Sequence, residues 1–329
     1  MTTLTSQVSV QDHVELVRRT AESPAPGRSA VAASWRRSLM HHQLDPAEIR
    51  RPDRVPQSTL RERREAAQDL LRIAGPILNR LAAAAMDTGS AVILSGPDGL
   101  ILEERSHPAD SADFGGAGLA AGASWSEADE GTNGIGTCLT ERRPVVIWHD
   151  QHFHTRNLAL TCMGAPIEAP GGGLAGVVDI SSCRRDLSEA QARLIGLTVQ
   201  DAATRIGCEL FAAAFPKARI IVMPGDPAQG PCQIAVDRDD LILGCNRAAR
   251  RAFGITDADI ALHRPAADLL RDAAGGTRGG LQDALRSEVL RALRRAGGNV
   301  SAAARDLRIG RATLYRKMDA LGLRAERQN

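Results

Sequence analysis

The pattern of apolar and polar positions predicts a sheet in the middle of the chain. Residues 90–103 (SAVILSGPDGLILE) contain two β-rich runs on either side of Gly-Pro-Asp-Gly, which is typical of a β-hairpin. Three more apolar runs predict further strands, at residues 143–149 (RPVVIWH), 162–167 and 173–182 (GLAGVVDISS). The alternation therefore favours a small antiparallel β-sheet.

Helical periodicity flanks these strands. We expect one long helix over residues 58–86 and another over residues 187–215. The apolar anchors expected in the second helix are Leu187, Leu194, Leu197 and Leu210. The RERRE run at residues 61–65 is expected to lie on a solvated helix face. A sheet between two long helices indicates a compact sensory domain.

The C-terminal pattern predicts three short helices. Leu285, Val289, Leu290 and Leu293 recur at helical spacing before Gly297-Gly298, a strong helix stop. Asn299 or Ser301 can cap a second helix, and Ile309-Gly310 forms the turn into a third, in which Leu314 and Met318 face inward. The polar residues left on the open face are Arg311, Thr313, Arg316 and Lys317. This layout is that of a helix-turn-helix, whose second helix enters the major groove of DNA.

Charge separates this C-terminal segment from the rest of the chain. The 329 residues have a net charge of +2, but residues 281–329 carry eleven Lys/Arg and five Asp/Glu, so their net charge is +6 and the first 280 residues carry −4. A basic end on a mildly acidic body suggests that this end meets a polyanion. The hydrophobic content of 43% suits ordinary cores, and the aromatic content of 3% makes those cores aliphatic.

Composition also bears on localisation. No run of 18 apolar residues is present, and the N-terminus lacks the pattern of a signal peptide, so we expect no membrane span and a cytoplasmic protein. The cysteines are scattered without a C-x-x-C pair, which indicates reduced thiols. They are Cys138, Cys162, Cys183, Cys208, Cys232 and Cys245.

The run G-N-x-S-x-A-A-x-x-L-x-I-x-R-x-T-L-Y-R-K-M at residues 298–318 resembles the Fis-type helix-turn-helix of bacterial enhancer-binding regulators. The resemblance implies contacts of Asn299 and Ser301 with phosphates, and of the later polar residues with base edges or backbone. The full set of DNA-binding residues expected is Asn299, Ser301, Arg305, Arg311, Thr313, Tyr315, Arg316 and Lys317. It also implies dimerisation through residues 281–296 and a palindromic operator on double-stranded DNA. The alternative is a basic helical hairpin without DNA-reading function.

Two stretches, GASWSEADEGTNGIGTCLTERRPVVIWHDQHF (122–153) and CMGAPIEAPGGGLAGVVDISS (162–182), resemble the GAF domain of the acetoin catabolism regulator family. Relatives usually have alanine at Gly134. The small residues of GTNGIGT allow a tight turn above a cavity, where Thr132 and Asn133 could bond a ligand. The candidate ligand-binding residues are Trp125, Glu127, Thr132, Asn133, Cys138, His149, Cys162 and Asp179.

Other interpretations of this region stay open. The GTNGIGT motif could simply build the fold, and no Gly-Lys-Ser/Thr follows it as a phosphate loop requires. His152 and His154 lie on a stretch with scattered cysteines, but the spacing does not favour a metal site, and we expect no metal and no cofactor. Cys138 and Cys162 could act as a thiol redox sensor.

The remaining segments complete an α+β multidomain organisation. Residues 34–46 (SWRRSLMHHQLDP) resemble the opening of the same family, with Trp35 and Leu39 pinning a helix onto the sensory domain. Residues 232–254 predict strand, turn, strand and helix, and resemble the start of a PAS domain. The expected parts are an N-terminal helical segment (1–85), a GAF sensory domain (86–213), a PAS-like segment (218–270), a linker (271–280) and a Fis-type helix-turn-helix (281–329).

The combination predicts a homodimeric, sequence-specific transcriptional regulator controlled by a small-molecule or redox signal. Relatives of this layout carry an ATPase between sensor and DNA-binding module, whereas the two lysines of this chain, Lys217 and Lys317, lie in no phosphate-loop pattern. We therefore expect no enzymatic activity, with RNA polymerase or a full-length relative as possible further partners. The rival functions are an architectural DNA-binding protein that uses the GAF domain as a dimerisation platform, and a thiol-based methionine sulfoxide reductase.

Overall fold

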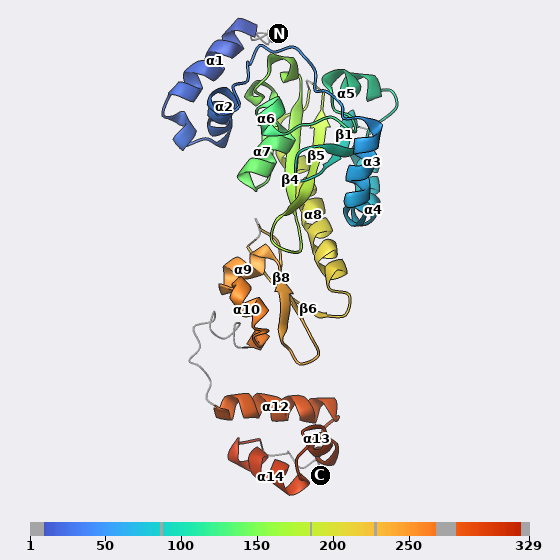
Figure 1. The fold of residues 1–329 in the computed structure, drawn as a ribbon, viewed down its shortest axis with the longest axis vertical. Coiled ribbons are helices and arrows are strands. Elements are labelled where there is room, and N and C mark those ends of the chain that lie inside the picture. The colour runs from blue at the N-terminus through green and yellow to red at the C-terminus, as the bar shows by residue number, and fades with distance from the viewer. Residues whose placement is uncertain (1–9, 86–87, 185, 227–228, 268–280, 324–329) are drawn as a thin grey trace. The chain divides into compact units, whose positions relative to one another are not determined.

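The computed structural model describes residues 10–85, 88–184, 186–226, 229–267 and 281–323 (Figure 1). The chain forms two compact units, divided between His263 and Arg264, and each is described by itself. The expected linker at 271–280 lies outside the described residues.

A five-stranded sheet forms the centre of the first unit. Its strands are β1 (Ser90–Ser95), β2 (Ile101–Arg105), β3 (Val145–Trp148), β4 (Thr161–Glu168) and β5 (Leu174–Ser182). Their spatial order is β2-β1-β5-β4-β3, and each adjacent pair is antiparallel. The hairpin expected at 90–103 is confirmed, with Val92 opposite Arg105. The strands expected from the later apolar runs are also present, so the predicted antiparallel sheet is confirmed.

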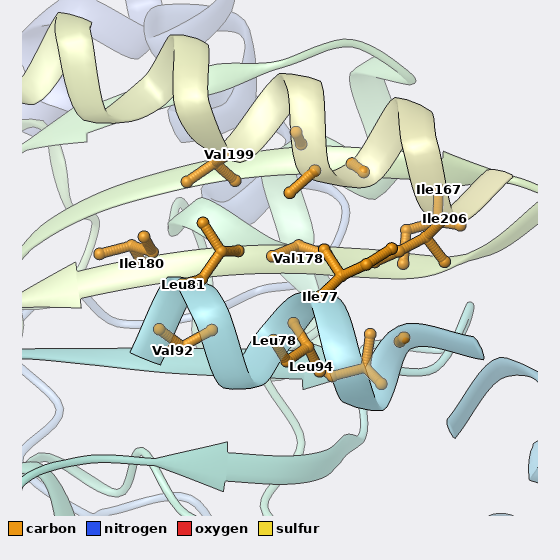
Figure 2. Close-up of a cluster of buried hydrophobic side chains, with 14 of the residues drawn as sticks. Ile77, Leu78, Leu81, Val92, Leu94, Ile167, Val178, Ile180, Val199 and Ile206 are labelled. Carbon is orange, nitrogen blue, oxygen red and sulfur yellow. The ribbon is translucent and has the colours of Figure 1, made fainter. Parts of the chain in front are cut away.

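Two long helices cover one face of this sheet. They are α4 (Gln68–Ala85) and α8 (Glu189–Ala214), and α3 (Gln57–Ala66) precedes α4. Figure 2 shows Leu78 and Leu81 of α4 packed with Val178 of β5 and Val199 of α8. The helix expected over 58–86 is broken at Ala67, where the backbone leaves helical geometry (φ −100°, ψ 18°). Arg61 to Glu65 are exposed, as expected.

Of the four leucines expected to anchor the long helix α8, two are exposed to solvent. Leu210 is buried and Leu187 packs against the core, but Leu194 is 65% exposed and Leu197 61% exposed. The buried residues of α8 are Ala192, Val199, Ala202, Ala203, Ile206, Leu210 and Phe211. Alanine has no long side chain to stand out in a hydropathy pattern, yet it allows a helix to lie close to a sheet. The leucines were therefore a misleading guide to the inward face.

Short helices and loops cover the other face. The helices are α5 (Ser111–Ala117), α6 (Glu127–Glu130) and α7 (Gly134–Glu141), and two 3₁₀ turns follow β3, η3 (His149–Gln151) and η4 (Thr155–Asn157). The core on this side is a second cluster that includes Ile93, Phe114, Trp125, Ile135 and Cys162. Both faces of the sheet are thus buried, which explains why β1 reads as a continuous apolar run and not as an alternation.

The N-terminal helices pack on the loop side of the sheet. They are α1 (Val10–Glu22) and α2 (Ala30–Met40), joined by the 3₁₀ turn η1 (Ala25–Gly27). Trp35 is buried with Val17 and Phe153, Leu39 packs against this cluster, and the Trp35 indole N–H donates to the Gln151 carbonyl at 2.9 Å. The expected anchoring role of Trp35 and Leu39 is confirmed.

A small three-stranded sheet follows α8. Its strands are β6 (Arg219–Met223), β7 (Cys232–Val236) and β8 (Ile242–Cys245), in the order β6-β7-β8, followed by α9 (Arg247–Phe253) and α10 (Asp257–Ala261). The expected order of strand, turn, strand and helix over 232–254 is therefore present, and the likeness to a PAS domain stays a prediction. The first unit joins this sheet to the N-terminal helices and the five-stranded sheet without a break at the expected boundaries.

Residues 281–323 of the second unit form three helices: α12 (Leu281–Arg295), α13 (Val300–Asp306) and α14 (Arg311–Ala320). Their core contains Val289, Ala292, Ala303, Ala304, Leu314 and Met318. Gly297 and Gly298 end α12 in the left-handed region, with φ of 58° and 83°, as the helix stop predicted. Leu290, expected on the same face as Val289, is instead 38% exposed.

Candidate functional sites

The helix-turn-helix is built as the sequence predicts. Asn299 caps α13: its Oδ1 accepts from the backbone N–H of Ser301 at 3.0 Å and of Ala302 at 3.1 Å. Buried Ala303 and Ala304 allow α13 and α14 to cross closely, and Leu314 and Met318 fix the inner face of α14. The Asn299 side chain therefore has a capping role, whatever it also contacts on DNA.

The outer face of α14 is open and basic. Arg311 and Arg316 are exposed, Tyr315 is 41% exposed, and Thr313 and Lys317 are half-buried. The Arg311 guanidinium lies over the Tyr315 ring, 5.6 Å from its centroid, which restricts both side chains. Of the other candidates, Arg305 is exposed and Ser301 is half-buried at the start of α13. This surface can donate to phosphates and to the guanine edge.

In the first unit, the GTNGIGT turn is a helix cap. Asn133 is fully buried, and its Oδ1 accepts from the backbone N–H of Ile135 at 2.9 Å and of Gly136 at 2.8 Å, while its Nδ2 donates to the Gly131 carbonyl at 2.9 Å. A Cβ on Gly134 would lie 2.3 Å from Asp179 Oδ1 and 2.6 Å from Cys162 Cβ. The alanine usual in relatives therefore does not fit here unless its neighbours move, and the capping contacts support the interpretation that the motif builds the fold.

Glu127 and Thr132 belong to a buried network that reaches α2. The Glu127 carboxylate accepts from Arg37 Nε at 2.5 Å and from Arg37 Nη2 at 3.0 Å, and the Ser34 hydroxyl donates to it at 2.7 Å. Thr132 donates to Ser34 at 2.7 Å, and Arg37 also reaches Glu141 at 2.9 Å. These contacts join the N-terminal helices to the turn and satisfy the Glu127 carboxylate without a ligand.

A second buried network of polar side chains lies next to Gly134. His152 Nδ1 donates to the His149 carbonyl at 3.0 Å, and its Nε2 lies 3.3 Å from Cys162 Sγ. Cys162 Sγ is 3.1 Å from Ser181 Oγ, and Ser181 donates to Asp179 Oδ2 at 2.6 Å. The other carboxylate oxygen of Asp179, Oδ1, is buried without a hydrogen-bond partner.

Burial sets the protonation states of these polar side chains. It raises the pKa of Asp179 to about 6 and lowers the pKa of His152 to about 4. Burial and the nearby Asp179 carboxylate raise the pKa of the Cys162 and Cys138 thiols well above their usual value. At neutral pH both thiols stay protonated, so neither has the thiolate character that a reactive sensor cysteine needs.

The eight candidate ligand residues lie apart from the three pockets described in the first unit. Trp125 is buried and its indole N–H donates to the Gly118 carbonyl at 3.0 Å. His149 is half-buried and its Nδ1 donates to the Leu158 carbonyl at 3.3 Å. None of the eight lines the three described pockets of the first unit. Cys162 and Asp179 lie together beside Gly134. Asn133 and Glu127 have hydrogen-bond partners within the protein. Ligand binding by the eight candidate residues stays a prediction.

A cavity that the sequence did not indicate lies between the two sheets of the first unit. It measures about 320 Å³ and is bordered by the end of α7, by β4, by α8, and by β7 and α9 of the small sheet. Its lining includes Arg142, Glu168, Phe211, Gln233, Arg247 and Arg251. These residues are spread over more than a hundred positions, so no local motif could have indicated the site.

No group of three or more His, Cys, Asp and Glu side chains among the described residues is arranged to hold a metal ion. None of the described helices is both long enough and apolar enough to span a membrane.

The geometry can now be compared with known proteins. Residues 9–205 match the family model described as "MimR, N-terminal domain", and this match covers more than half of the chain. The chain belongs to the MimR N-terminal domain family. Residues 286–321, which include α13 and α14, match the model "Bacterial regulatory protein, Fis family". The resemblance to regulators with a Fis-type helix-turn-helix is confirmed.

Three curated relatives are named as transcriptional regulators. The acetoin catabolism regulatory protein of Cupriavidus necator is 30% identical over 52% of this chain and 27% of its own length. The propane 2-monooxygenase operon transcriptional activator MimR of Mycolicibacterium smegmatis is 33% identical over 50% of this chain and 27% of its own length. AcoR, the acetoin dehydrogenase operon transcriptional activator of Bacillus subtilis, is 31% identical over 47% and 25%. The matched part of this chain thus spans about a quarter of the length of each of these three relatives.

A solved structure supports the fold. The E. coli DhaR(N)–DhaL complex contains a chain that aligns with 69% of this protein and 77% of its own length, with a TM-score of 0.52 and 15% identity. At this identity the match concerns the fold alone: a mixed α/β arrangement.

Proposed function

We propose that this protein is a cytoplasmic, sequence-specific DNA-binding transcriptional regulator that acts as a homodimer on a palindromic operator. The observation that carries the proposal is the open basic face of α14, where Arg311 and Arg316 are exposed while Leu314 and Met318 hold the opposite face in the core. A helix held in this way can enter the major groove, and Arg offers the bidentate contact with guanine. The Fis-family match over the same residues supports it.

The first unit is proposed to sense the signal. The relatives of this chain include regulators named for acetoin catabolism and for a propane 2-monooxygenase operon, and this supports control by a small molecule. The buried, protonated thiols of Cys138 and Cys162 disfavour the redox alternative and the reductase. The proposal includes regulation without ATP hydrolysis, by recruiting or blocking RNA polymerase or by competing with a longer relative for its sites.

The test begins with selection of binding sites from fragmented genomic DNA by the full-length protein. A few sharp palindromic sites are expected. Broad, salt-sensitive binding without a shared motif would instead favour an architectural DNA-binding protein.

On a selected site, Arg316→Ala is expected to weaken specific binding by about 1–3 kcal/mol. The control is Arg193→Ala on α8 of the first unit, because Arg193 is 68% exposed, paired with Glu189 at 3.3 Å and outside the helix-turn-helix. The control should retain the affinity of the wild type in gel-shift titrations at fixed salt. Equal affinities of Arg316→Ala and the wild type would refute the placement of α14 on DNA.

A further inference from the structure

We propose that strand β6 pairs with β6 of a second copy of this chain, so that the small sheets of two first units join into one continuous sheet. β6 is an edge strand of the sheet β6-β7-β8, and its strand partner there is β7. The outer side of an edge strand presents backbone N–H and C=O groups to which another strand can bind. The inference rests on the homodimer of the proposed function and adds a contact in the first unit, independent of DNA recognition.

The backbone groups of Ile220 and Val222 face away from β7. Gln233 of β7 faces β8, because its carbonyl accepts from the Asn246 N–H at 3.0 Å and its own N–H donates to Asn246 Oδ1 at 3.0 Å. Successive residues of an antiparallel strand face opposite edges, so the residues beside Gln233 face β6, and one of them is the register partner of Ile221. Ile220 and Val222, on either side of Ile221, therefore present their N–H and C=O groups at the outer edge.

The other edge strands differ from β6 in this respect. The outer side of β2, β3 and β8 makes at least one hydrogen bond with the surrounding chain. These bonds run from the Gly122 N–H to the Ile101 carbonyl at 2.8 Å, from the Trp148 N–H to Gln151 Oε1 at 3.0 Å, and from His263 Nδ1 to the Ile242 carbonyl at 3.3 Å. By contrast, no hydrogen bond from the described residues reaches the outer backbone groups of Ile220 and Val222.

The side chains of β6 also leave its edge open. The strand reads RIIVM, and its charged residue, Arg219, is ion-paired with Asp240 of the same sheet. Val222 is 59% exposed, and the other apolar residues of the strand are half-buried. Natural sheets usually protect a bare edge with a charge, a proline or a bulge. An apolar edge without this protection favours pairing with another strand.

The strand is complementary to itself in the antiparallel orientation. With a two-fold axis at Ile221, Ile220 of each copy lies opposite Val222 of the other, and each such pair exchanges two backbone hydrogen bonds. The side chains of Ile220 and Val222 lie on one face of the strand, so the exposed Val222 is covered by Ile220 of the second copy. A two-fold pairing uses both free edges, and assembly stops at the dimer.

Charge complementarity favours a second copy as the occupant of this edge. In the register centred on Ile221, Arg219 lies opposite Met223, so no like charges face each other. Beyond the strand, the same register brings Lys217 of one copy opposite residue 225 of the other, next to Asp226. Lys217 and Asp226 are both exposed, and the symmetry brings this pair of opposite charges together at each end of the joined strands.

Cysteine cross-linking of the full-length protein tests the pairing directly. Ile221→Cys places a thiol at the two-fold axis, where the Cα atoms of a non-hydrogen-bonded pair lie about 4.5 Å apart, within the range of a disulfide. The matched control is Arg238→Cys in the turn between β7 and β8, because Arg238 is 94% exposed and lies on the same sheet.

Under a mild oxidant, non-reducing electrophoresis should show a covalent dimer of Ile221→Cys. It should form at least about tenfold faster than with Arg238→Cys or the wild type, because pairing raises the effective concentration of the two thiols. The rate should also be unchanged on dilution above the dissociation constant of the dimer, whereas random collision would slow in proportion to concentration. Equal rates for Ile221→Cys and Arg238→Cys would overturn the proposal.

A second variant removes the outer hydrogen bonds. Val222→Pro lacks the N–H that faces away from β7, and proline is tolerated on an edge strand for this reason. In analytical ultracentrifugation the dimer of Val222→Pro should dissociate at least about tenfold more readily, since one bond is lost from each copy. Val222→Thr keeps the N–H and the branched side chain and should associate as the wild type does. Unchanged association of a folded Val222→Pro would contradict the pairing, and the cross-linking test decides if this variant does not fold.

The outcomes separate the pairing from the proposed function. A dimer that binds its operator while Ile221→Cys does not cross-link would refute the pairing alone. Ready cross-linking without any specific operator would refute the regulator and leave the pairing intact. A protein that is monomeric at every concentration would refute both the homodimer and the pairing. Protection of the Ile220 and Val222 amides from hydrogen exchange in such a monomer would show that the chain covers this edge itself.

Discussion

The ion pair between Arg37 and Glu127 offers the sharpest test of how the N-terminal helices are held. Glu127 was a candidate ligand residue, yet its carboxylate accepts two hydrogen bonds from Arg37 and one from Ser34. The Glu127 side chain is 3% exposed and that of Arg37 28%. If these contacts are structural, removing the carboxylate should lower the stability of the first unit before any ligand is added.

The expected loss for Glu127→Ala follows from these contacts. Breaking a buried ion pair by removing one partner costs about 3–5 kcal/mol, because the other charge stays behind without compensation. Here Arg37 is partly exposed and keeps Glu141 at 2.9 Å, so the remaining charge is not isolated. We therefore expect the lower end of that range, about 3 kcal/mol. Arg37→Ala and the double variant complete a cycle that isolates the coupling between the two side chains.

Tryptophan fluorescence in a urea titration provides the assay. The three tryptophans, Trp35, Trp125 and Trp148, all lie in the first unit, so the signal reports on that unit even if the second unfolds separately. The control is Glu209→Ala, which breaks the exposed pair between Arg205 and Glu209 on α8 and should cost about 0.5 kcal/mol or less. A loss below about 1 kcal/mol for Glu127→Ala would refute the structural role, since even the ordinary hydrogen bonds lost would cost that much.

Three more predictions concern other parts of the molecule. The folded-state pKa of Asp179 is raised from 3.8 to about 6, so its protonated form is favoured on folding. The wild type should therefore lose about 2 kcal/mol of stability relative to Asp179→Asn as pH rises from about 4 to 7 in the same fluorescence assay, and a pH-independent difference would contradict this. In brief iodoacetamide labelling read by mass spectrometry, fully buried Cys162 should stay unmodified in the native protein while half-buried Cys208 is labelled, and equal labelling of both thiols would show that the Cys162 site opens readily. If α12 forms the proposed dimer interface, Leu290→Glu at its exposed apolar position should shift the protein towards monomer in analytical ultracentrifugation and weaken operator binding; an unchanged dimer would exclude this position from the interface.

The order of elements could be predicted from the sequence where the signal is local. The Gly-Pro-Asp-Gly turn marked the hairpin of β1 and β2, and Gly297-Gly298 marked the end of α12, because turn and cap preferences depend on a few neighbouring residues. The cap at Asn299 and the inward face of α14 followed from spacing for the same reason. The candidate DNA-reading face is therefore largely a property of one contiguous stretch.

The roles of the sensory residues depended on contacts between distant segments. Asn133 and Glu127 both looked like ligand contacts; Asn133 caps α7 through its immediate neighbours, whereas the partner of Glu127 is the guanidinium of Arg37, 90 positions away, which only the fold brings to it. The buried face of α8 was predicted wrongly from Leu194 and Leu197, which are exposed. The face that a helix buries depends on the surface it packs against as well as on its own apolar residues.

The sequence by itself determined the family, the succession of helices and strands, and the basic helix-turn-helix, all of which depend on short-range preferences and contiguous motifs. Only the tertiary structure decided which polar side chains are satisfied and where a cavity remains. Gln233 and Arg251 meet at one cavity because β7 and α9 pack beside β4 and α8, and neither residue has a neighbour in sequence that would reveal it. Hydrogen-bond satisfaction and burial are properties of surfaces in contact, and those surfaces exist only after the chain has folded.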